Sequence, residues 1–290
     1  MTRREGANSM KQETKAPADG ALRRWEGIDY YLVNPTGNIT LLAITPVPVS
    51  RQPEIAAMLM RGEPTGEQAG FLSESERADI KLRMAGGEFC GNATLSAAAC
   101  FCVRRGLEAG RERAVTVEAS GCDTPLTVSV RRTEDGEAFR ASVCMPEHRS
   151  LTRRTLRYRD RVYTLPVVDE GGILHIVAEE PLGLTDREAE EAVRLWCREL
   201  DAEALGIMEL RRGAEGGIEL RPLVYVPGAG TCCWESSCAS GSAAVGLCLL
   251  ESGWSGEALS LREPGGVLTI AAQDGQIVLG GRVEIVPPRG

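Results

Sequence analysis

The sequence predicts an α+β fold made of two similar halves, and two observations carry this prediction. First, a motif recurs: Cys90 and Cys238 each stand directly before a stretch of small residues with helical character. Counted from each cysteine, both copies have Ala or Gly three residues on, a hydroxyl residue at the fourth position and another cysteine at the tenth. Second, each half places several strand-like segments around one such helix, which favours an α+β repeat over alternating βαβ units.

The composition limits the class of protein. A chain of 290 residues with 43% apolar residues can bury a substantial core, and its length fits two domains. A net charge of −8 disfavours nucleic acid and anionic membranes as partners. There is no apolar run long enough to cross a bilayer. Ten cysteines without a secretory signal indicate reduced thiols, and we expect a cytoplasmic protein.

The expected domain boundaries follow from local composition. Residues 1–26 are charged and lack an apolar core, so we expect a disordered leader there. An N-terminal domain is expected over 27–146 and a C-terminal domain over 147–280, with 281–290 returning to the first domain. The polar stretch 146–153, which is interrupted by proline, is the expected linker.

In the first half, β-type patterns separated by turn residues predict the strands. The helix over 53–61 has apolar residues on one face. The helix over 91–105 is mostly alanine on one side, so surrounding strands can enclose it. The predicted strands cover 28–33, 39–44, 79–84, 114–119, 125–131 and 138–144.

The second half repeats this order. A hairpin is expected to turn at Arg159-Asp160, and a strongly amphipathic helix is expected over 186–200, capped by Thr185 or Asp186. A second small-residue helix is expected after Cys238. The predicted strands cover 156–158, 162–168, 173–178, 218–226, 259–262, 267–271, 276–279 and 282–286.

Two helix-capping cysteines suit a specific chemistry. The partial positive charge at a helix N-terminus favours the thiolates of Cys90 and Cys238. Inversion at the α-carbon of an amino acid needs a base on one face, an acid on the other, and stabilisation of an enolate-like carboxylate. A thiolate, a thiol and the free N–H groups of two helices can fill these roles without a metal or organic cofactor. A pyridoxal phosphate enzyme needs a Schiff-base lysine, and none of Lys11, Lys15 and Lys81 stands out as one.

These motifs resemble those of the diaminopimelate epimerases, which are cofactor-independent amino-acid racemases. Cys90-Gly-Asn-Ala-Thr looks like the family's first catalytic motif, and Cys238-Ala-Ser-Gly-Ser looks like the second. Asn34-Pro-Thr-Gly-Asn38 resembles an early motif whose asparagine contacts the substrate. The resemblance implies two pseudo-symmetric domains, each a curved, mostly antiparallel sheet around a central helix, with the active site between them.

The departures from that family concern the substrate. Val226-Pro227 replaces a Glu-Arg pair whose arginine receives the distal carboxylate of diaminopimelate. Gly172-Ile-Leu-His175 replaces Gly-Asn-Pro-His, and an insertion covers 231–237. The sequence around Cys90 looks like the histidine racemase branch, some members of which serve opine metallophore synthesis. The resemblance therefore implies histidine racemisation to the D form. Diaminopimelate, another amino acid, and a non-catalytic binding or redox-sensing role are the alternatives.

Each candidate site residue also has a structural interpretation. Glu67 and Glu235 can receive an imidazole or an ammonium group, although most glutamates are solvated. Glu88 can simply favour a helix N-terminus. His175 is expected to be a core residue, and Cys232 and Cys233 do not complete a zinc set. The expected partner is a small molecule, the amino-acid substrate, and a homodimer is left open. The catalytic candidates are Cys90 and Cys238, and the substrate-binding candidates are Asn38, Glu67, Glu88, Gly91, Asn92, Glu235, Ala239, Ser240 and Gly241.

Overall fold

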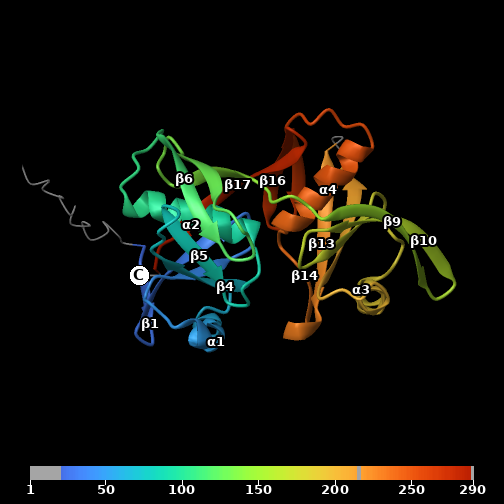
Figure 1. Cartoon of the computed structure of the whole chain (residues 1–290), viewed down its shortest axis with the longest axis horizontal. Coiled ribbons are helices and arrows are strands. Elements are labelled where there is room, and N and C mark those ends of the chain that lie inside the picture. The colour runs from blue at the N-terminus through green and yellow to red at the C-terminus, as the bar shows by residue number, and fades with distance from the viewer. Residues whose placement is uncertain (1–20, 214–216, 289–290) are drawn as a thin grey trace, which may run out of the picture.

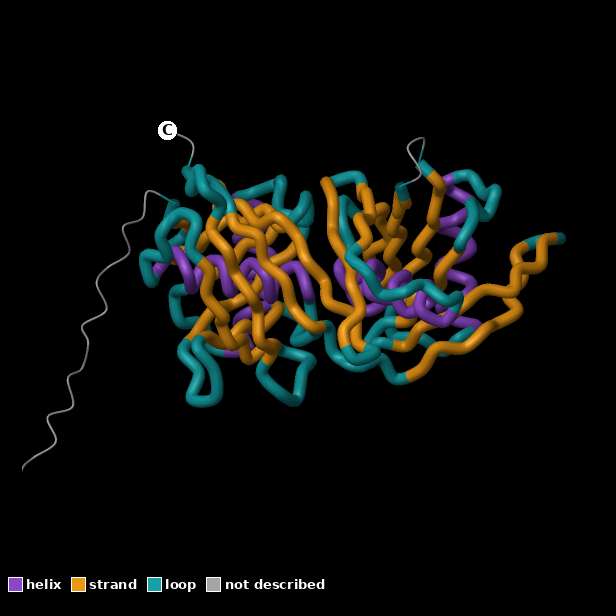
Figure 2. The backbone as a smooth tube through the Cα atoms, turned by 90° about the horizontal axis from the view of Figure 1, so that it is seen from above, coloured by secondary structure: helices purple, strands orange, loops and turns teal. Residues whose placement is uncertain are grey.

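The computed structural model describes residues 21–213 and 217–288, which form two lobes side by side (Figure 1). In each lobe, strands surround one central helix, and a second helix lies outside the strands (Figures 1 and 2). The central helices are α2 (Gly91–Arg104) and α4 (Ala239–Glu251), and the outer ones are α1 (Gln52–Gly62) and α3 (Asp186–Glu199).

In the N-terminal lobe, eight strands close into a barrel. Each strand pairs with the next in the order β2-β3-β4-β5-β6-β7-β8-β17, and β17 pairs back with β2. The strands are β2 (Ile28–Pro35), β3 (Thr40–Ala43), β4 (Gln68–Ser73), β5 (Ile80–Met84), β6 (Glu112–Ala119), β7 (Leu126–Arg132), β8 (Phe139–Cys144) and β17 (Gln276–Val286).

The C-terminal lobe repeats this topology. A helix connects parallel strands at corresponding places: α3 joins β11 to β12 as α1 joins β3 to β4, and α4 lies between β13 and β15 as α2 lies between β5 and β6. Among the described residues, β9 and β17 do not pair, so this second sheet stays open. Its strands are β9 (Ser150–Tyr158), β10 (Arg161–Asp169), β11 (Leu174–Ala178), β12 (Leu205–Arg212), β13 (Ile218–Val226), β14 (Thr231–Trp234), β15 (Leu259–Glu263) and β16 (Gly266–Gln273).

Small side chains explain why a helix can lie inside the barrel. The interior of an eight-stranded barrel is just wide enough for side chains. The alanines at 97–99 of α2 are fully buried against the strands, as are the bulkier Leu95 and Cys100. The outer helix α3 is different, because it has a wide apolar stripe and a polar face. It begins at the predicted cap, where the Thr185 side chain and Glu188 form a capping box.

The strand β17 belongs to both lobes. Its first residues pair with β16, and its last residues pair with β2, where Ile285 faces Val33. The chain also crosses between lobes after β8, because Met145 leads towards β9. Two segments therefore connect the halves, and the sheet is continuous across them.

Several predictions about elements were wrong or incomplete. The expected leader contains β1 (Arg23–Trp25), which pairs with β2; residues 1–20 lie outside the described part. The linker expected over 146–153 is shorter because β9 begins at Ser150. Most side chains of β9 are exposed, and many of them are Arg or Thr. This polar sequence did not indicate a strand before residue 156. β4, β12 and β14 had no predicted counterpart. Among the described residues, no helix is both long and apolar enough to span a membrane.

Candidate active site

Both cysteines cap helices as predicted. Cys90 has an extended backbone and directly precedes α2, and the N–H of Ala93 donates a hydrogen bond to its Sγ (3.4 Å). Cys238 precedes α4 in the same way, and the N–H of Gly241 donates to its Sγ (3.4 Å). Each thiol therefore lies beside the first N–H groups of a helix, which have no partner within the helix.

The two helix N-termini meet between the lobes. A Cβ added to Gly91 would lie only 2.8 Å from the Cβ of Ala239, so these two residues pack directly against each other. The side-chain amide of Asn92 donates to the backbone carbonyl of Ser237 (3.4 Å), and both residues are almost fully buried. Because these four residues are neighbours of Cys90 and Cys238 in sequence, both cysteines lie at this contact between the lobes.

A polar network beside Cys90 also joins the lobes. The amide of Asn38 donates to Glu67 (2.8 Å), and the hydroxyl of Ser236 donates to the other Glu67 oxygen (2.7 Å). Gln68 donates to Asn38 (2.6 Å) and accepts from the Cys90 thiol (3.3 Å). Asn38 and Glu67 were predicted site residues, whereas Gln68 and Ser236 were missed because no motif marks them.

Carboxylates make the site acidic. Burial, aided by the charge of Glu67, raises the pKa of Glu235 to about 7. Glu235 lies close enough to both cysteines for its charge to raise their pKa values. Glu88 is exposed, and its charge adds to the rise at Cys90. Of the three predicted glutamates, Glu235 thus lies near both thiols, Glu88 lies near Cys90, and Glu67 lies near Glu235.

The helix ends favour the thiolates as expected, but they do not decide the net pKa of either thiol. Burial raises the pKa of Cys90 to about 11, and it raises the pKa of Cys238 well above the usual range. The N–H groups of Ala93 and Gly241 do lower these pKa values, as predicted, but by less than burial raises them. The desolvation of a thiolate outweighs one capping hydrogen bond.

Glu263 at the end of β15 is a site residue that the sequence did not reveal. It is only 4% exposed, and it accepts hydrogen bonds from the N–H of Cys238 (2.7 Å) and the hydroxyl of Ser242 (2.5 Å). Burial raises its pKa to about 7. Glu263 holds the backbone at the start of α4, and its charge raises the pKa of Cys238. No motif signals it, because the fold brings it to Cys238 from a different strand.

His175 is buried as predicted, but it is not an isolated core residue. Its Nε2 lies 3.0 Å from the hydroxyl of Ser240, which in turn lies 3.7 Å from the Sγ of Cys238. Its Nε2 is also 3.4 Å from a Glu170 carboxylate oxygen. Ser240 was predicted to bind substrate, and here its hydroxyl contacts both Cys238 and His175.

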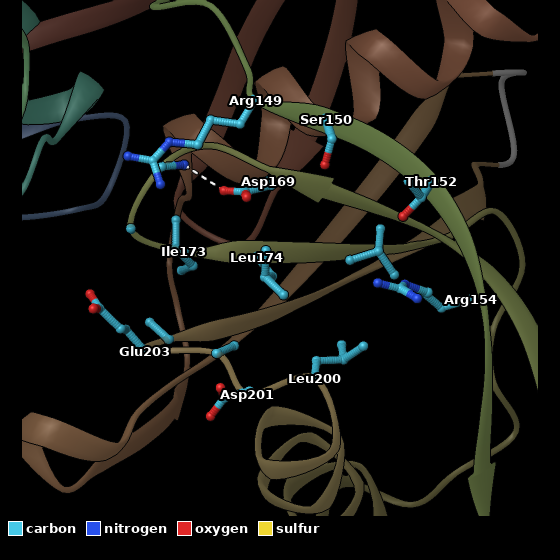
Figure 3. A pocket seen from close by; sticks show the side chains of 15 residues that line it. Arg149, Ser150, Thr152, Arg154, Asp169, Ile173, Leu174, Leu200, Asp201 and Glu203 are labelled. Atoms are coloured by element: carbon cyan, nitrogen blue, oxygen red, sulfur yellow. Dashed lines mark hydrogen bonds between the residues drawn. The ribbon is translucent and has the colours of Figure 1, made fainter.

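A hollow in the C-terminal lobe does not coincide with the cysteines. Among the described residues, no group of three or more His, Cys, Asp or Glu side chains could hold a metal ion. A hollow of about 440 Å³ lies in the C-terminal lobe between β9, β10 and the end of α3 (Figure 3). It is lined by Arg149, Arg154, Asp169 and Asp201, among others, and by none of the predicted site residues. The reactive groups therefore place the candidate active site at the lobe interface.

Comparisons with known proteins identify the family of this chain. Residues 27–288 match the family model described as "Histidine racemase CntK N-terminal domain". A histidine racemase of Fusobacterium nucleatum is 28% identical over 268 residues, covering 91% of this chain and 96% of the relative.

Solved structures share the fold. A probable proline racemase from Agrobacterium radiobacter has a TM-score of 0.65 at 16% identity, covering 90% of this chain and 91% of that one. A phenazine biosynthesis protein of the PhzF family from Enterococcus faecalis has a TM-score of 0.59 at 15% identity, covering 89% and 96%. Because the family match spans nearly the whole described chain, the protein belongs to the histidine racemase family.

Proposed function

We propose that this protein interconverts L- and D-histidine at the α-carbon, using Cys90 and Cys238 and no organic cofactor. The observation that carries the proposal is the meeting of two cysteine-capped helices at one interface, which the contact between Gly91 and Ala239 makes plain. Membership of the histidine racemase family supports the same reaction. The proposed substrate cleft lies between a domain of residues 27–146, completed by the end of β17, and a domain of residues 147–280.

The reaction proceeds by two proton transfers. The thiolate of one cysteine removes the α-proton, and the electron pair left on the α-carbon is delocalised into the carboxylate. The thiol of the other cysteine then donates its proton to the opposite face, which inverts the centre. The free N–H groups at the starts of α2 and α4 receive the carboxylate as its negative charge grows. The roles of Cys90 and Cys238 are exchanged in the reverse direction.

The acidic site prepares the thiols for this step. A substrate ammonium group that enters among Glu67, Glu88 and Glu235 brings a positive charge close to both sulfurs, and this charge lowers their pKa values. The protein thus keeps its thiols protonated when empty and activates one of them on binding. Hydrogen bonds to Glu67 and Gln68 hold the Asn38 side chain in place beside Cys90.

The same carboxylates favour histidine over diaminopimelate. An imidazole can be protonated near neutral pH or can donate an N–H when neutral, so a glutamate can receive it in either state. A distal carboxylate would instead face like charge, and Val226-Pro227 offers no guanidinium to bind it. We propose Glu67 and Glu235 as the receivers of the ammonium group and the imidazole.

The test is incubation with single L-amino acids in heavy water, followed by NMR of the α-proton and chiral chromatography. L-Histidine should lose its α-proton and yield D-histidine, with kcat/KM at least roughly a hundredfold above that of diaminopimelate. A chelator and a carbonyl reagent such as hydroxylamine should leave the rate unchanged. Comparable kcat/KM for the two substrates would refute the specificity, and an absence of exchange with every amino acid would favour a binding role.

A further inference from the structure

We propose that Ser240, His175 and Glu170 form a proton path between Cys238 and a second cavity, through which Cys238 exchanges its proton without the opening of the substrate cleft. The proposal rests on the two-thiol function above. In this proposal, the three residues help to return Cys238 to its starting protonation state between turnovers. This step is separate from the inversion of the substrate.

The contacts are continuous. The Sγ of Cys238 lies 3.7 Å from the Oγ of Ser240, and this hydroxyl lies 3.0 Å from the Nε2 of His175. The same Nε2 lies 3.4 Å from an oxygen of Glu170. His175 is fully buried, whereas the Glu170 side chain is 14% exposed. The path therefore leads from a shielded thiol to a carboxylate that reaches the surface.

The hydrogen bonding of His175 fits a relay. Its Nδ1 is buried and has no partner among the described residues, and a Cβ at Gly206 would lie only 2.5 Å from it. All polar contacts of the ring are therefore made by Nε2. A neutral ring with its proton on Nδ1 leaves Nε2 free to accept from Ser240. The facing Glu170 oxygen is also buried without a hydrogen bond, and it gains one when Nε2 carries a proton.

Glu170 ends the path at a cavity of about 200 Å³, which also lies against Glu147, His148, Asp274 and Ala243. None of the predicted site residues lines this cavity. Its volume holds several water molecules, each of which occupies roughly 30 Å³ in the liquid. Glu147 at its wall is exposed, so the water there can exchange with bulk solvent.

The reaction creates the need for such a path. After one inversion, the thiolate has gained a proton and the thiol has lost one, so the enzyme must reset before it can invert the same enantiomer again. Cys238 is only 7% exposed, so it has little contact with water in the cleft. Cys90 is less buried, and its partner Gln68 has no transferable acid proton, so it exchanges through the cleft.

Every proton is accounted for in the transfer. Cys238 gives its S–H proton to Ser240 while the Ser240 hydroxyl proton moves to Nε2 of His175. The imidazolium then passes the Nε2 proton to the Glu170 carboxylate, which releases it to cavity water. The net change is loss of one proton from Cys238 and gain of one by solvent. Reprotonation follows the same steps in reverse.

Kinetics give the first test, with Glu170→Gln as the variant and Glu147→Gln, which changes the same cavity, as the matched control. Glu170→Gln should leave the first turnover of α-deuterated L-histidine unchanged and lower kcat roughly tenfold to a hundredfold. Added formate, a small carboxylate that fits the cavity, should restore part of kcat. Glu147→Gln should behave like the wild type. Equal losses in the first turnover and in kcat, or no loss in either, would overturn the path.

Infrared spectroscopy gives a second test that does not depend on catalysis. The S–H stretching band of Cys238, identified by its absence in Cys238→Ser, should convert to S–D in heavy water more slowly in Glu170→Gln and His175→Gln than in the wild type. Unchanged exchange in both variants would overturn the path. A protein that racemises no amino acid but shows the slowed exchange would refute the proposed function alone.

Discussion

At the scale of single residues, Cys90 and Cys238 hold matching positions in unlike surroundings. The Cys90 thiol donates to the neutral side chain of Gln68, and it remains partly exposed. Cys238 is more deeply buried. Glu235 raises the pKa of both thiols, but the second carboxylate is the buried Glu263 for Cys238 and the exposed Glu88 for Cys90. The sequence repeat thus conceals an electrostatic difference, and we expect the two thiols to react with alkylating agents at different rates.

Replacement of either cysteine by serine should abolish racemisation. A serine hydroxyl is nearly the size of a thiol but holds its proton far more tightly, so Cys90→Ser and Cys238→Ser should each lower kcat by roughly three orders of magnitude. The double variant should be little worse, because the thiols act as a unit. Chiral chromatography of histidine measures the loss, and Cys144→Ser on β8 is the control. Near-normal racemisation in either variant would remove that cysteine from the mechanism.

The site shows what a motif can predict at this scale. Cys90, Cys238 and Asn38 could be found because each stands in a recognisable local pattern. Gln68 and Glu263 could not be found in this way, because they lie on strands that only folding brings beside the cysteines. The ionisation of the thiols could not be predicted either. It depends on how deeply each thiol is buried, and a motif at the start of a helix does not show this.

At the scale of elements, the starts of α2 and α4 set the spacing of the thiols. Because Gly91 has no side chain, the Cβ of Ala239 can occupy that space, and the two helices approach closely.

Strongly patterned elements such as α3 could be predicted with their caps. β12 contains the apolar residues Ile207 and Met208, which could have indicated a strand. β4 showed no strand pattern, and β9 is mostly polar, so only its last residues, 156–158, were predicted.

Gly91→Ala should separate the helix ends and lower kcat/KM at least roughly tenfold, because a small displacement of reacting groups costs rate steeply. The compensating change Ala239→Gly frees the same space, so the double variant should regain most of the activity. Gly172→Ala, where an added Cβ meets nothing within 4 Å, is the control. Racemisation assays with thermal melts would separate this effect from unfolding. Failure of the second change to rescue the first would show that the helix contact does not set the geometry.

At the scale of the whole molecule, the prediction was two similar α+β halves; the strands and helices recur in the same order, but within one continuous sheet. The sequence could not predict that the first sheet closes into a barrel while the second stays open. Closure depends on the pairing of β17 with β2, which lie at opposite ends of the chain. A local sequence pattern cannot show which distant strand will pair with β2.

The buried carboxylates should make stability depend on pH. Burial raises the pKa of Glu263 from an ordinary 4.5 to about 7. Between these two values the folded protein binds more protons than the unfolded chain, so the free energy of unfolding falls as pH rises, and it levels off above about pH 7. Glu263→Gln should therefore gain stability relative to the wild type across this window, by at most roughly 3 kcal/mol.

Urea unfolding at a series of pH values measures this difference, with the exposed Glu257→Gln as the control. The gain of Glu263→Gln should be smallest near pH 4.5 and largest above pH 7. A gain that does not change with pH would mean that folding leaves the pKa of Glu263 unchanged.

The sharing of β17 between the lobes has a consequence for the making of the protein. The barrel that starts with β2 lacks its closing strand until the C-terminal lobe has been translated, because β17 follows β16. A ribosome that has finished only the first half has produced a chain with two unpaired strand edges, β2 and β8, which are open to chaperones and proteases. The proposed active site lies where the halves meet, and on this proposal neither half can acquire activity before the other has been synthesised.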